Sequence, residues 1–303
     1  MSTDVPTADG QLRAFDVVVL FGVMAIWGLN FAVAKTGLEE LPPLIFMALR
    51  FLLVAALLLP FAKRPHGQWL PLMAISFTLG ILHFAFMFTG LTTLDAATAA
   101  IAIQLQVPFA ALLAAIFFND KLGWRRGIAM LLAFAGVAII AGEPRLDGQY
   151  LALAFVIFAA CMWSVASVQI KRLDPPVDGF TLNAWIAVFA TPQLALASLL
   201  IEEGQIEALY AAGFWAYFAI VYQAVAVVVI GYGAWYWLLR RYQLNQVMPA
   251  MLLIPVFGVF SGIAFLGETL TANLVIGGLV TVAGVAIIII RRPKATAPGT
   301  ERL

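Results

Sequence analysis

Residues 27–35 have the sequence Trp-Gly-Leu-Asn-Phe-Ala-Val-Ala-Lys, and residues 163–171 have the related sequence Trp-Ser-Val-Ala-Ser-Val-Gln-Ile-Lys. Each stretch places a tryptophan and small polar side chains inside an apolar run and ends with a lysine. We therefore interpret the chain as two copies of one unit. Because the polar interruptions occur at corresponding places, they suggest a membrane pathway built twice.

The composition of the chain indicates a membrane environment. Of its 303 residues, 63% are hydrophobic and 11% are charged, whereas soluble domains are roughly half apolar and a quarter charged. A chain in a bilayer must satisfy its backbone hydrogen bonds internally, as a helical bundle or a closed barrel. Long continuous apolar runs favour helices over the alternating strands of a barrel. The sequence predicts an all-α integral membrane protein.

Apolar runs of about 20 residues, the length that crosses a bilayer, predict ten transmembrane helices. They cover residues 15–34, 43–62, 70–91, 96–118, 124–142, 149–170, 179–201, 213–238, 246–266 and 272–290. We expect a first five-helix repeat at 15–142, a second at 149–290, and tails at 1–14 and 291–303.

The basic residues are distributed unevenly over the predicted loops. Of the 17 Lys and Arg, 14 fall on one side of the membrane, only Lys35 and Arg145 fall on the other, and Arg50 lies within the second span. The positive-inside rule then places both termini in the cytoplasm. The net charge of +1 argues against nucleic acid as a partner.

An odd number of spans in each half requires the halves to enter the membrane from opposite sides, so the repeat is an inverted one. Residues 135–140 (Ala-Gly-Val-Ala-Ile-Ile) recur as residues 283–288, which supports the duplication. Inverted repeats are frequent in transporters, because conformations exchanged between the halves open a central site to each side in turn.

Two prolines, Pro108 and Pro255, lie at nearly corresponding places in the fourth and ninth spans. Proline removes one helical hydrogen bond and frees the carbonyl four residues earlier, here those of Gln104 and Met251. A tolerated kink is one interpretation. A hinge or gate beside a binding site is the other.

His83 lies near the centre of the third span, with Met87 on about the same helical face. It is the only deeply placed group that titrates near neutral pH. A neutral histidine could donate a structural hydrogen bond between helices, but polar residues at this depth usually face a cavity. We expect His83 and Met87 to line the substrate pathway.

Trp27 shares a helical face with Asn30, and Trp163 shares one with Ser167, because residues three or four apart are neighbours on a helix. An indole offers an apolar wall, and a nearby amide or hydroxyl can hold a polar head group. Helix packing is the alternative. We expect the two pairs to form opposed walls of one cavity.

Two further polar residues lie deep in the predicted spans. Gln104 and Gln106 point about 200° apart in a regular helix, and we favour Gln104 for the cavity because it is nearer the proline break. Tyr232, flanked by Gly231 and Gly233, is deep enough to line the same cavity.

Arg50 lies about a third of the way into the second span. It could bind a substrate carboxylate, extend toward the membrane surface, or bond to carbonyls between helices. Its place near a span end favours a structural role.

All 16 Asp and Glu fall in tails, loops or span ends. Carriers coupled to protons or sodium commonly use a carboxylate within the membrane, so the sequence favours facilitated diffusion over proton coupling. A membrane enzyme would need acids, histidines or metal ligands clustered at one depth. We therefore expect no enzyme activity, no metal and no cofactor.

Several motifs together resemble the EamA branch of the drug/metabolite transporter superfamily. They are residues 27–31 with Lys35, Pro42-Pro43, Leu49-Arg50-Phe51, Gly231-Tyr232-Gly233, Pro255 and residues 266–271. The chain is most similar to bacterial inner-membrane exporters of the O-acetylserine/cysteine and aromatic amino acid types. Two departures are Lys121, in a corner that is usually acidic, and residues 164–167, which differ from residues 28–31.

The resemblance implies ten helices with a central cavity between the halves, in the bacterial inner membrane. It implies export of neutral, aromatic or sulfur-containing amino acids and related metabolites by alternating access. Export of another small metabolite or a drug, with or without proton coupling, is the alternative. The expected partners are a small-molecule substrate and the lipid bilayer. The oligomeric state stays open, and a monomer is compatible with the sequence.

Overall fold

The computed structural model describes residues 12–65, 67–118 and 123–290. Ten helices in this part of the chain are long and apolar enough to cross a membrane, and the described residues contain no strand. The prediction of an all-α membrane protein with ten spans is confirmed. Residues 1–11 of the first expected tail, the whole of the second at 291–303, and the corner at Lys121 lie outside the described residues.

Half of the spans are single α-helices and half change helix type along their length. The single helices are α1 (Ala14–Leu38), α7 (Trp124–Ala141), α8 (Tyr150–Lys171), α9 (Gly179–Ile201) and α15 (Ala272–Ile290). The second span is α2 (Pro43–Leu58) with η1 (Leu59–Phe61), and the third is α3 (Trp69–Ser76), η2 (Phe77–Ala85) and α4 (Phe86–Thr93). The fourth is α5 (Ala96–Ala102), η3 (Ile103–Leu105) and α6 (Gln106–Phe118). The eighth is α11 (Phe214–Val221), η5 (Tyr222–Tyr232) and α12 (Gly233–Arg241), and the ninth is η6 (Met248–Leu252) with α14 (Leu253–Leu266).

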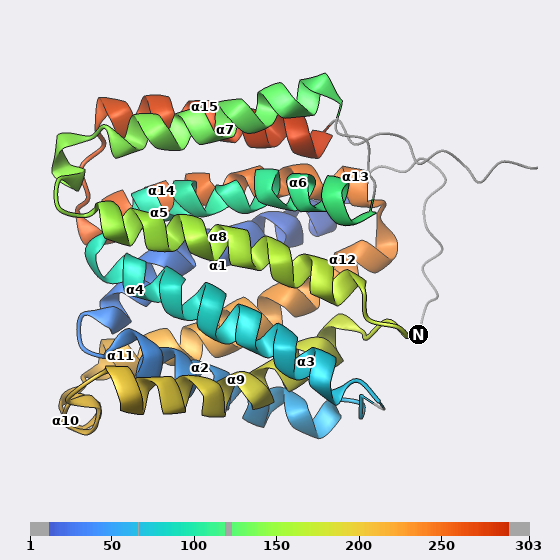
Figure 1. Cartoon of the computed structure of the whole chain (residues 1–303), viewed down its shortest axis with the longest axis vertical. Coiled ribbons are helices and arrows are strands. Elements are labelled where there is room, and N and C mark those ends of the chain that lie inside the picture. Colours follow the sequence, from blue (N-terminus) through green and yellow to red (C-terminus); the bar gives the residue numbers. More distant parts are fainter. Residues whose placement is uncertain (1–11, 66, 119–122, 291–303) are drawn as a thin grey trace, which may run out of the picture.

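The helices run roughly parallel to one axis, with α7 and α15 at one side of the bundle and α2 and α9 at the other (Figure 1). The short connecting helices are η4 (Pro144–Leu146), α10 (Gln205–Ala211) and α13 (Leu244–Val247). α1 begins and α15 ends at the same end of the bundle, which we call the terminal face. The other end, which carries η4 and α10, is the opposite face.

The contacts between helices repeat with the two-fold pattern of an inverted duplication. α2 packs on α9 and α7 packs on α15, so each of these pairs joins equivalent spans of the two halves. The contact of α1 with α14 is matched by that of α8 with α6. Likewise, η5 contacts α1 and α2 as η2 contacts α8 and α9.

Glycines let α7 and α15 approach closely. A Cβ atom on Gly136 would lie 2.5 Å from the Gly277 carbonyl oxygen, and one on Gly284 would lie 2.5 Å from the Ala129 carbonyl oxygen. Only a residue without a side chain fits at such a distance. Small residues of this kind are the usual means of helix association in lipid.

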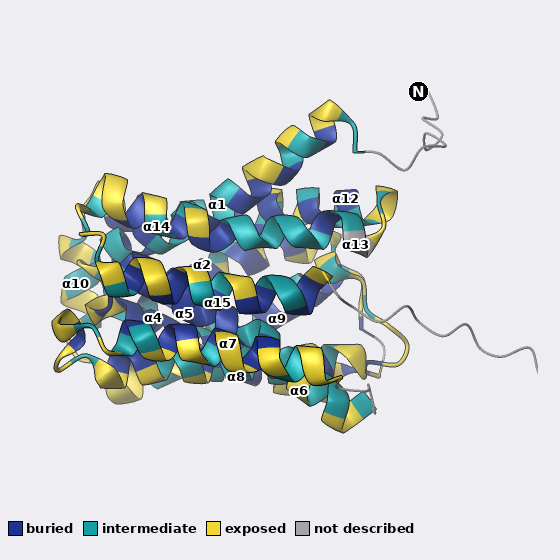
Figure 2. Ribbon diagram, turned by 90° about the horizontal axis from the view of Figure 1, so that it is seen from above, coloured by how far each residue is buried: buried dark blue, intermediate teal, exposed yellow. Residues whose placement is uncertain are grey.

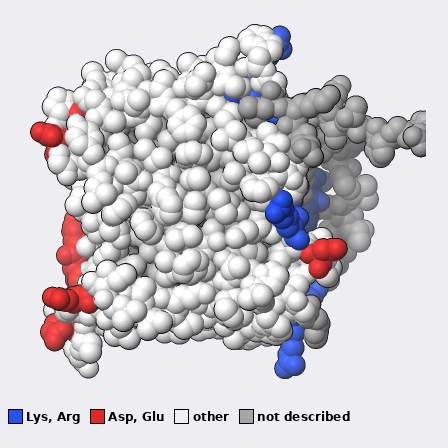
Figure 3. All heavy atoms as spheres, viewed as in Figure 1, with Lys and Arg blue, Asp and Glu red and all other residues white. Residues whose placement is uncertain are grey.

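The outer surface matches a lipid environment. Most of the long helices have a buried face and an exposed face (Figure 2). Exposed outward residues include Leu131, Leu199 and Leu279. On the side shown in Figure 3, Lys, Arg, Asp and Glu gather at the two ends and leave an uncharged band between them. Such a band can face hydrocarbon without burying charge in lipid.

Corresponding spans of the two halves are irregular at corresponding places. η2 in the third span and η5 in the eighth are π-helical. In the fourth and ninth spans, the 3₁₀ segments η3 and η6 come just before Pro108 and Pro255. Proline cannot donate the backbone hydrogen bond of a regular helix, and π-helical turns often occur at functional sites.

Candidate functional site

The first of the two related stretches, residues 27–35, contacts the eighth span through Trp27. Trp27 donates a hydrogen bond from Nε1 to the Val227 carbonyl oxygen at 3.2 Å. Its ring centroid lies 5.1 Å from that of Tyr232 and 5.7 Å from that of Trp235. A Cβ atom on Gly231 would lie 2.6 Å from Trp27 Nε1, so this glycine makes room for the indole. Trp27, Tyr232 and Trp235 form the first aromatic cluster.

A second aromatic cluster occupies the related position between the third and sixth spans. The His83 ring centroid lies 4.9 Å from that of Trp163 and 4.6 Å from that of Phe84. His83 Nδ1 lies 2.8 Å from the Ala159 carbonyl oxygen. Since a carbonyl can only accept, Nδ1 carries the hydrogen and Nε2 is free to accept.

Arg50 lies on α2, a helix that contacts both η2 and η5. Its guanidinium carbon is 4.5 Å from the centroid of the Phe84 ring, which belongs to the second cluster, and 5.4 Å from that of the Phe51 ring. Only 4% of Arg50 is exposed. The idea that Arg50 extends to the membrane surface is therefore wrong.

The hydrogen bonds of Arg50 are poorly satisfied. Its Nη1 approaches the Met47 sulfur at 4.0 Å, a weak acceptor. Its Nε is buried and has no hydrogen-bond partner. In the described part of the chain, every ion pair lies near one of the two faces and none includes Arg50.

The other residues predicted for the site fall into two groups. Asn30 is half-buried and its Oδ1 has no partner. Met87 and Gln104 are buried, and η3, which carries Gln104, contacts α8. Ser167 lies apart from the clusters, because it is exposed and donates to the Trp163 carbonyl oxygen of its own helix at 2.9 Å.

Gln223 was missed by the sequence analysis. It lies in η5, it is fully buried, and neither atom of its amide group has a hydrogen-bond partner. An unpartnered buried amide is costly and is uncommon in folded proteins. The signal was present in the sequence, since Gln223 is a lone amide within the apolar run of the eighth span.

Charged side chains join the two halves at the opposite face. Lys35 Nζ lies 2.5 Å from the Leu94 carbonyl oxygen and 3.6 Å from Glu268 Oε1. Glu268 also accepts hydrogen bonds from the backbone N–H groups of Ala96 and Ala97, at 2.5 and 2.9 Å. A carboxylate at the start of α5 is favoured by the helix dipole.

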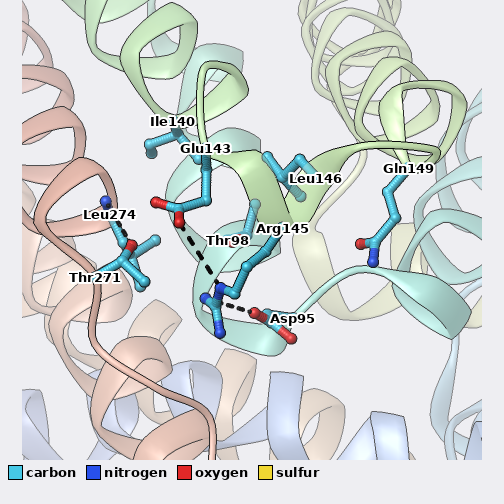
Figure 4. Close-up of a pocket in the computed structure, with 9 residues that line it drawn as sticks. All are labelled: Asp95, Thr98, Ile140, Glu143, Arg145, Leu146, Gln149, Thr271 and Leu274. Atoms are coloured by element: carbon cyan, nitrogen blue, oxygen red, sulfur yellow. Dashed lines mark hydrogen bonds and ion pairs between the residues drawn. The ribbon is translucent and has the colours of Figure 1, made fainter.

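Arg145 extends this network. It donates to Thr269 and lies 3.2 Å from Asp95 Oδ2 and 3.9 Å from Glu143 Oε1. These side chains converge on a cavity of about 160 Å³ at the opposite face, where Arg145 points between Glu143 and Asp95 (Figure 4). We call Lys35, Asp95, Arg145 and Glu268 the opposite-face network.

The terminal face lacks the equivalent closure. α5 packs on α14 near the opposite face, where a Cβ atom on Gly258 would lie 2.4 Å from the Ala100 Cβ. The repeat predicts a matching contact of α6 with α13 and η6, but among the described residues no comparable contact occurs. A cavity of about 390 Å³ also opens here beside Gln68 and Gln169.

Comparison with known proteins gives the family. The EamA-like transporter family matches the chain twice, at residues 15–142 and 150–290. A probable amino-acid metabolite efflux pump of Salmonella typhimurium is 32% identical over 274 residues, which cover 88% of this chain and 91% of that protein. A protein of the same name from Escherichia coli is 31% identical, covering 90% of this chain and 94% of that one.

A solved crystal structure has the same fold, with a TM-score of 0.61 at 19% identity, and it covers 91% of this chain and 96% of the other. The two family matches span most of the chain, and the relatives are named as efflux pumps. The chain belongs to the EamA-like transporter family, and it is a membrane transporter rather than an enzyme.

Proposed function

We propose that this protein exports neutral amino acids, including aromatic and sulfur-containing ones, and related metabolites across the bacterial inner membrane. The names of the relatives support an amino-acid metabolite as cargo. The aromatic clusters around Trp27 and Trp163 suit apolar side chains, and the polar groups of Asn30 and Tyr232 suit the charged end of an amino acid.

The main support for this proposal is that the bundle is closed at the opposite face and lacks the equivalent helix contact at the terminal face in the part of the chain that the structure describes. α5 and α14 are packed together near the opposite face, whereas the described residues of α6, α13 and η6 make no comparable contact near the terminal face. In an inverted repeat, exchange of these contacts between the halves would close the terminal face and open the other. We propose that transport occurs by this alternating access, with Pro108 and Pro255 as hinges.

The charge distribution supports an orientation. On the side shown in Figure 3, the basic residues lie at the terminal face and most of the acidic residues lie at the opposite face, where Lys35 and Arg145 are paired with acids. By the positive-inside rule, the terminal face is cytoplasmic. Substrate then enters from the cytoplasm in the conformation described here, which is the direction that export requires.

We propose that transport is facilitated diffusion. In the described chain, the buried acid Asp16 lies in the first turn of α1 and accepts a hydrogen bond from Tyr242 near the terminal face. The remaining described acids lie at helix ends or in connections, so no carboxylate at mid-membrane depth is available for coupling to protons.

The test is flux of a panel of labelled amino acids in proteoliposomes, with a proton gradient on or off. The proposal predicts flux of neutral amino acids down their own gradient at the same rate in both conditions. Absence of flux for every amino acid would overturn the cargo. Uphill accumulation driven by the proton gradient would overturn facilitated diffusion and favour a proton-coupled exporter.

A further inference from the structure

Contacts between helices place several polar side chains at one depth. A Cβ atom on Gly37 would lie 2.5 Å from Phe46 and 3.0 Å from the Ala219 Cβ, so these three residues of α1, α2 and α11 are level with one another. α2 and the eighth span both run inward from this level. Arg50 and Gln223 each follow four residues later, about one turn deeper.

A second level is set by the hydrogen bond between Trp27 and Val227. Trp27 is ten residues from Gly37 along α1, which corresponds to about 15 Å. Asn30 lies one turn from Trp27 toward Gly37, and it is therefore also between the two levels. Arg50, Asn30 and Gln223 thus form a polar layer inside the bundle.

The polar layer is rich in unpartnered groups. Arg50 Nε, Asn30 Oδ1 and both amide atoms of Gln223 are buried without a hydrogen-bond partner. One of these groups is a cation and the amides can supply acceptors. Burial of an unpaired charge is far more costly than burial of a neutral polar group, so Arg50 is the member that most requires an anion.

The surroundings of Arg50 leave its donors available. The guanidinium lies over the Phe84 ring at 4.5 Å, a cation–π arrangement that uses its flat face. At its edge, Nε has no partner and Nη1 has only the weak acceptor Met47 Sδ, so a carboxylate would be a better acceptor for two parallel hydrogen bonds. The ring centroids of His83 and Trp163 lie 4.6 and 6.4 Å from that of Phe84.

We propose that Arg50 binds the carboxylate of the transported molecule, with the amide oxygens of Asn30 and Gln223 accepting hydrogen bonds from its ammonium group. The site selects zwitterions, because a carboxylate neutralises the buried guanidinium and an amine without one cannot. This inference rests on the proposed transport of amino acids and names the groups that recognise them.

The first test uses the unmodified protein. Flux of the best-transported amino acid in proteoliposomes is measured against two unlabelled competitors, the same amino acid and its carboxamide, in which the carboxylate is neutral. We expect the carboxamide to compete at least about tenfold more weakly, since a hydrogen bond to a charged group contributes about this factor. Equal competition by the two compounds would overturn the proposal.

The second test uses variants of Arg50. Arg50→Gln should weaken the apparent affinity for the amino acid about tenfold or more and should remove the preference over the carboxamide. Arg50→Lys keeps the charge and should keep part of that preference. It therefore tests recognition of the carboxylate even if Arg50→Gln does not fold. A purely structural arginine would lower the amount of folded protein and leave the preference unchanged, which would contradict the proposal.

The matched control is Arg125→Gln. Arg125 is also near an aromatic ring, 5.3 Å from the Trp124 centroid, but it is exposed at the terminal face, so this change should alter neither flux nor preference. The two proposals fail differently. No flux of any amino acid in the unmodified protein overturns the transport function, whereas flux with equal competition by the carboxamide overturns only the role of Arg50.

Discussion

Lys35 of the first half lies 3.6 Å from Glu268 of the second half, and this ion pair joins the ends of α1 and α14, which seven spans separate in the sequence. Glu268 is at the same time hydrogen-bonded to the start of α5. One carboxylate therefore holds α1, α5 and the end of α14 together at the opposite face. If the terminal face is cytoplasmic, this pair helps to close the outer side of the pathway.

Glu268→Gln should weaken that closure, because the neutral amide loses the attraction to Lys35 and one of its two acceptor oxygens. The reporter protein carries Asn30→Cys, and Cys161→Ser removes the native thiol. A membrane-impermeant thiol reagent added outside should label position 30 about fivefold faster in Glu268→Gln than with Glu268 present, because the closed state loses about 1 kcal/mol of stability. Glu207→Gln, an exposed acid at the same face, is the control. Equal labelling rates in the two variants would show that Glu268 does not contribute to the closure.

Trp27→Ala and Trp163→Ala test the aromatic clusters. Each removes a ring that packs at a tilt against another proposed site residue, Tyr232 or His83, so each should lower amino-acid flux about tenfold while the protein still inserts in the membrane. Trp215→Ala removes an indole that is 61% exposed and should leave flux unchanged. Unchanged flux in both cluster variants would remove these residues from the pathway.

The sequence predicted the ten spans well because hydropathy and charge act over whole helices. It could not predict π-helical turns, since no residue type marks them in η2 or η5. Counting along one helix placed Arg50 about a third of the way into its span, but it could not show that the side chain is buried, because that burial arises from the helices packed around α2. The i, i+4 rule grouped Ser167 with Trp163. The Trp163 side chain lies instead near His83, toward the start of its own helix, as helical side chains tend to.

Gln223→Leu should separate stability from transport. Replacing a buried amide without partners by an apolar side chain of similar size removes a desolvation cost of about 1–3 kcal/mol, so the unfolding temperature in detergent should rise. Flux should fall, because an acceptor for the substrate ammonium is lost. A fall in both quantities would show that Gln223 has partners in the folded protein and contributes to stability.

Gly136→Ala tests the seam between α7 and α15. The added Cβ would lie 2.5 Å from the Gly277 carbonyl oxygen, so the helices must separate, at a cost of about 1–3 kcal/mol for an overpacked site. Gly127→Ala on the same helix meets no atom within 4 Å and should be neutral or stabilising. Thermal unfolding in detergent measures both, and equal unfolding temperatures would contradict the close packing.

The most direct test of alternating access is counterflow. Proteoliposomes loaded with an unlabelled neutral amino acid are diluted into a trace of the labelled form, and internal label is followed over time. A site that opens to each side in turn predicts transient accumulation of label above its external concentration, because exchange is faster than net efflux. Label that only approaches the external concentration, without overshoot, would contradict the account.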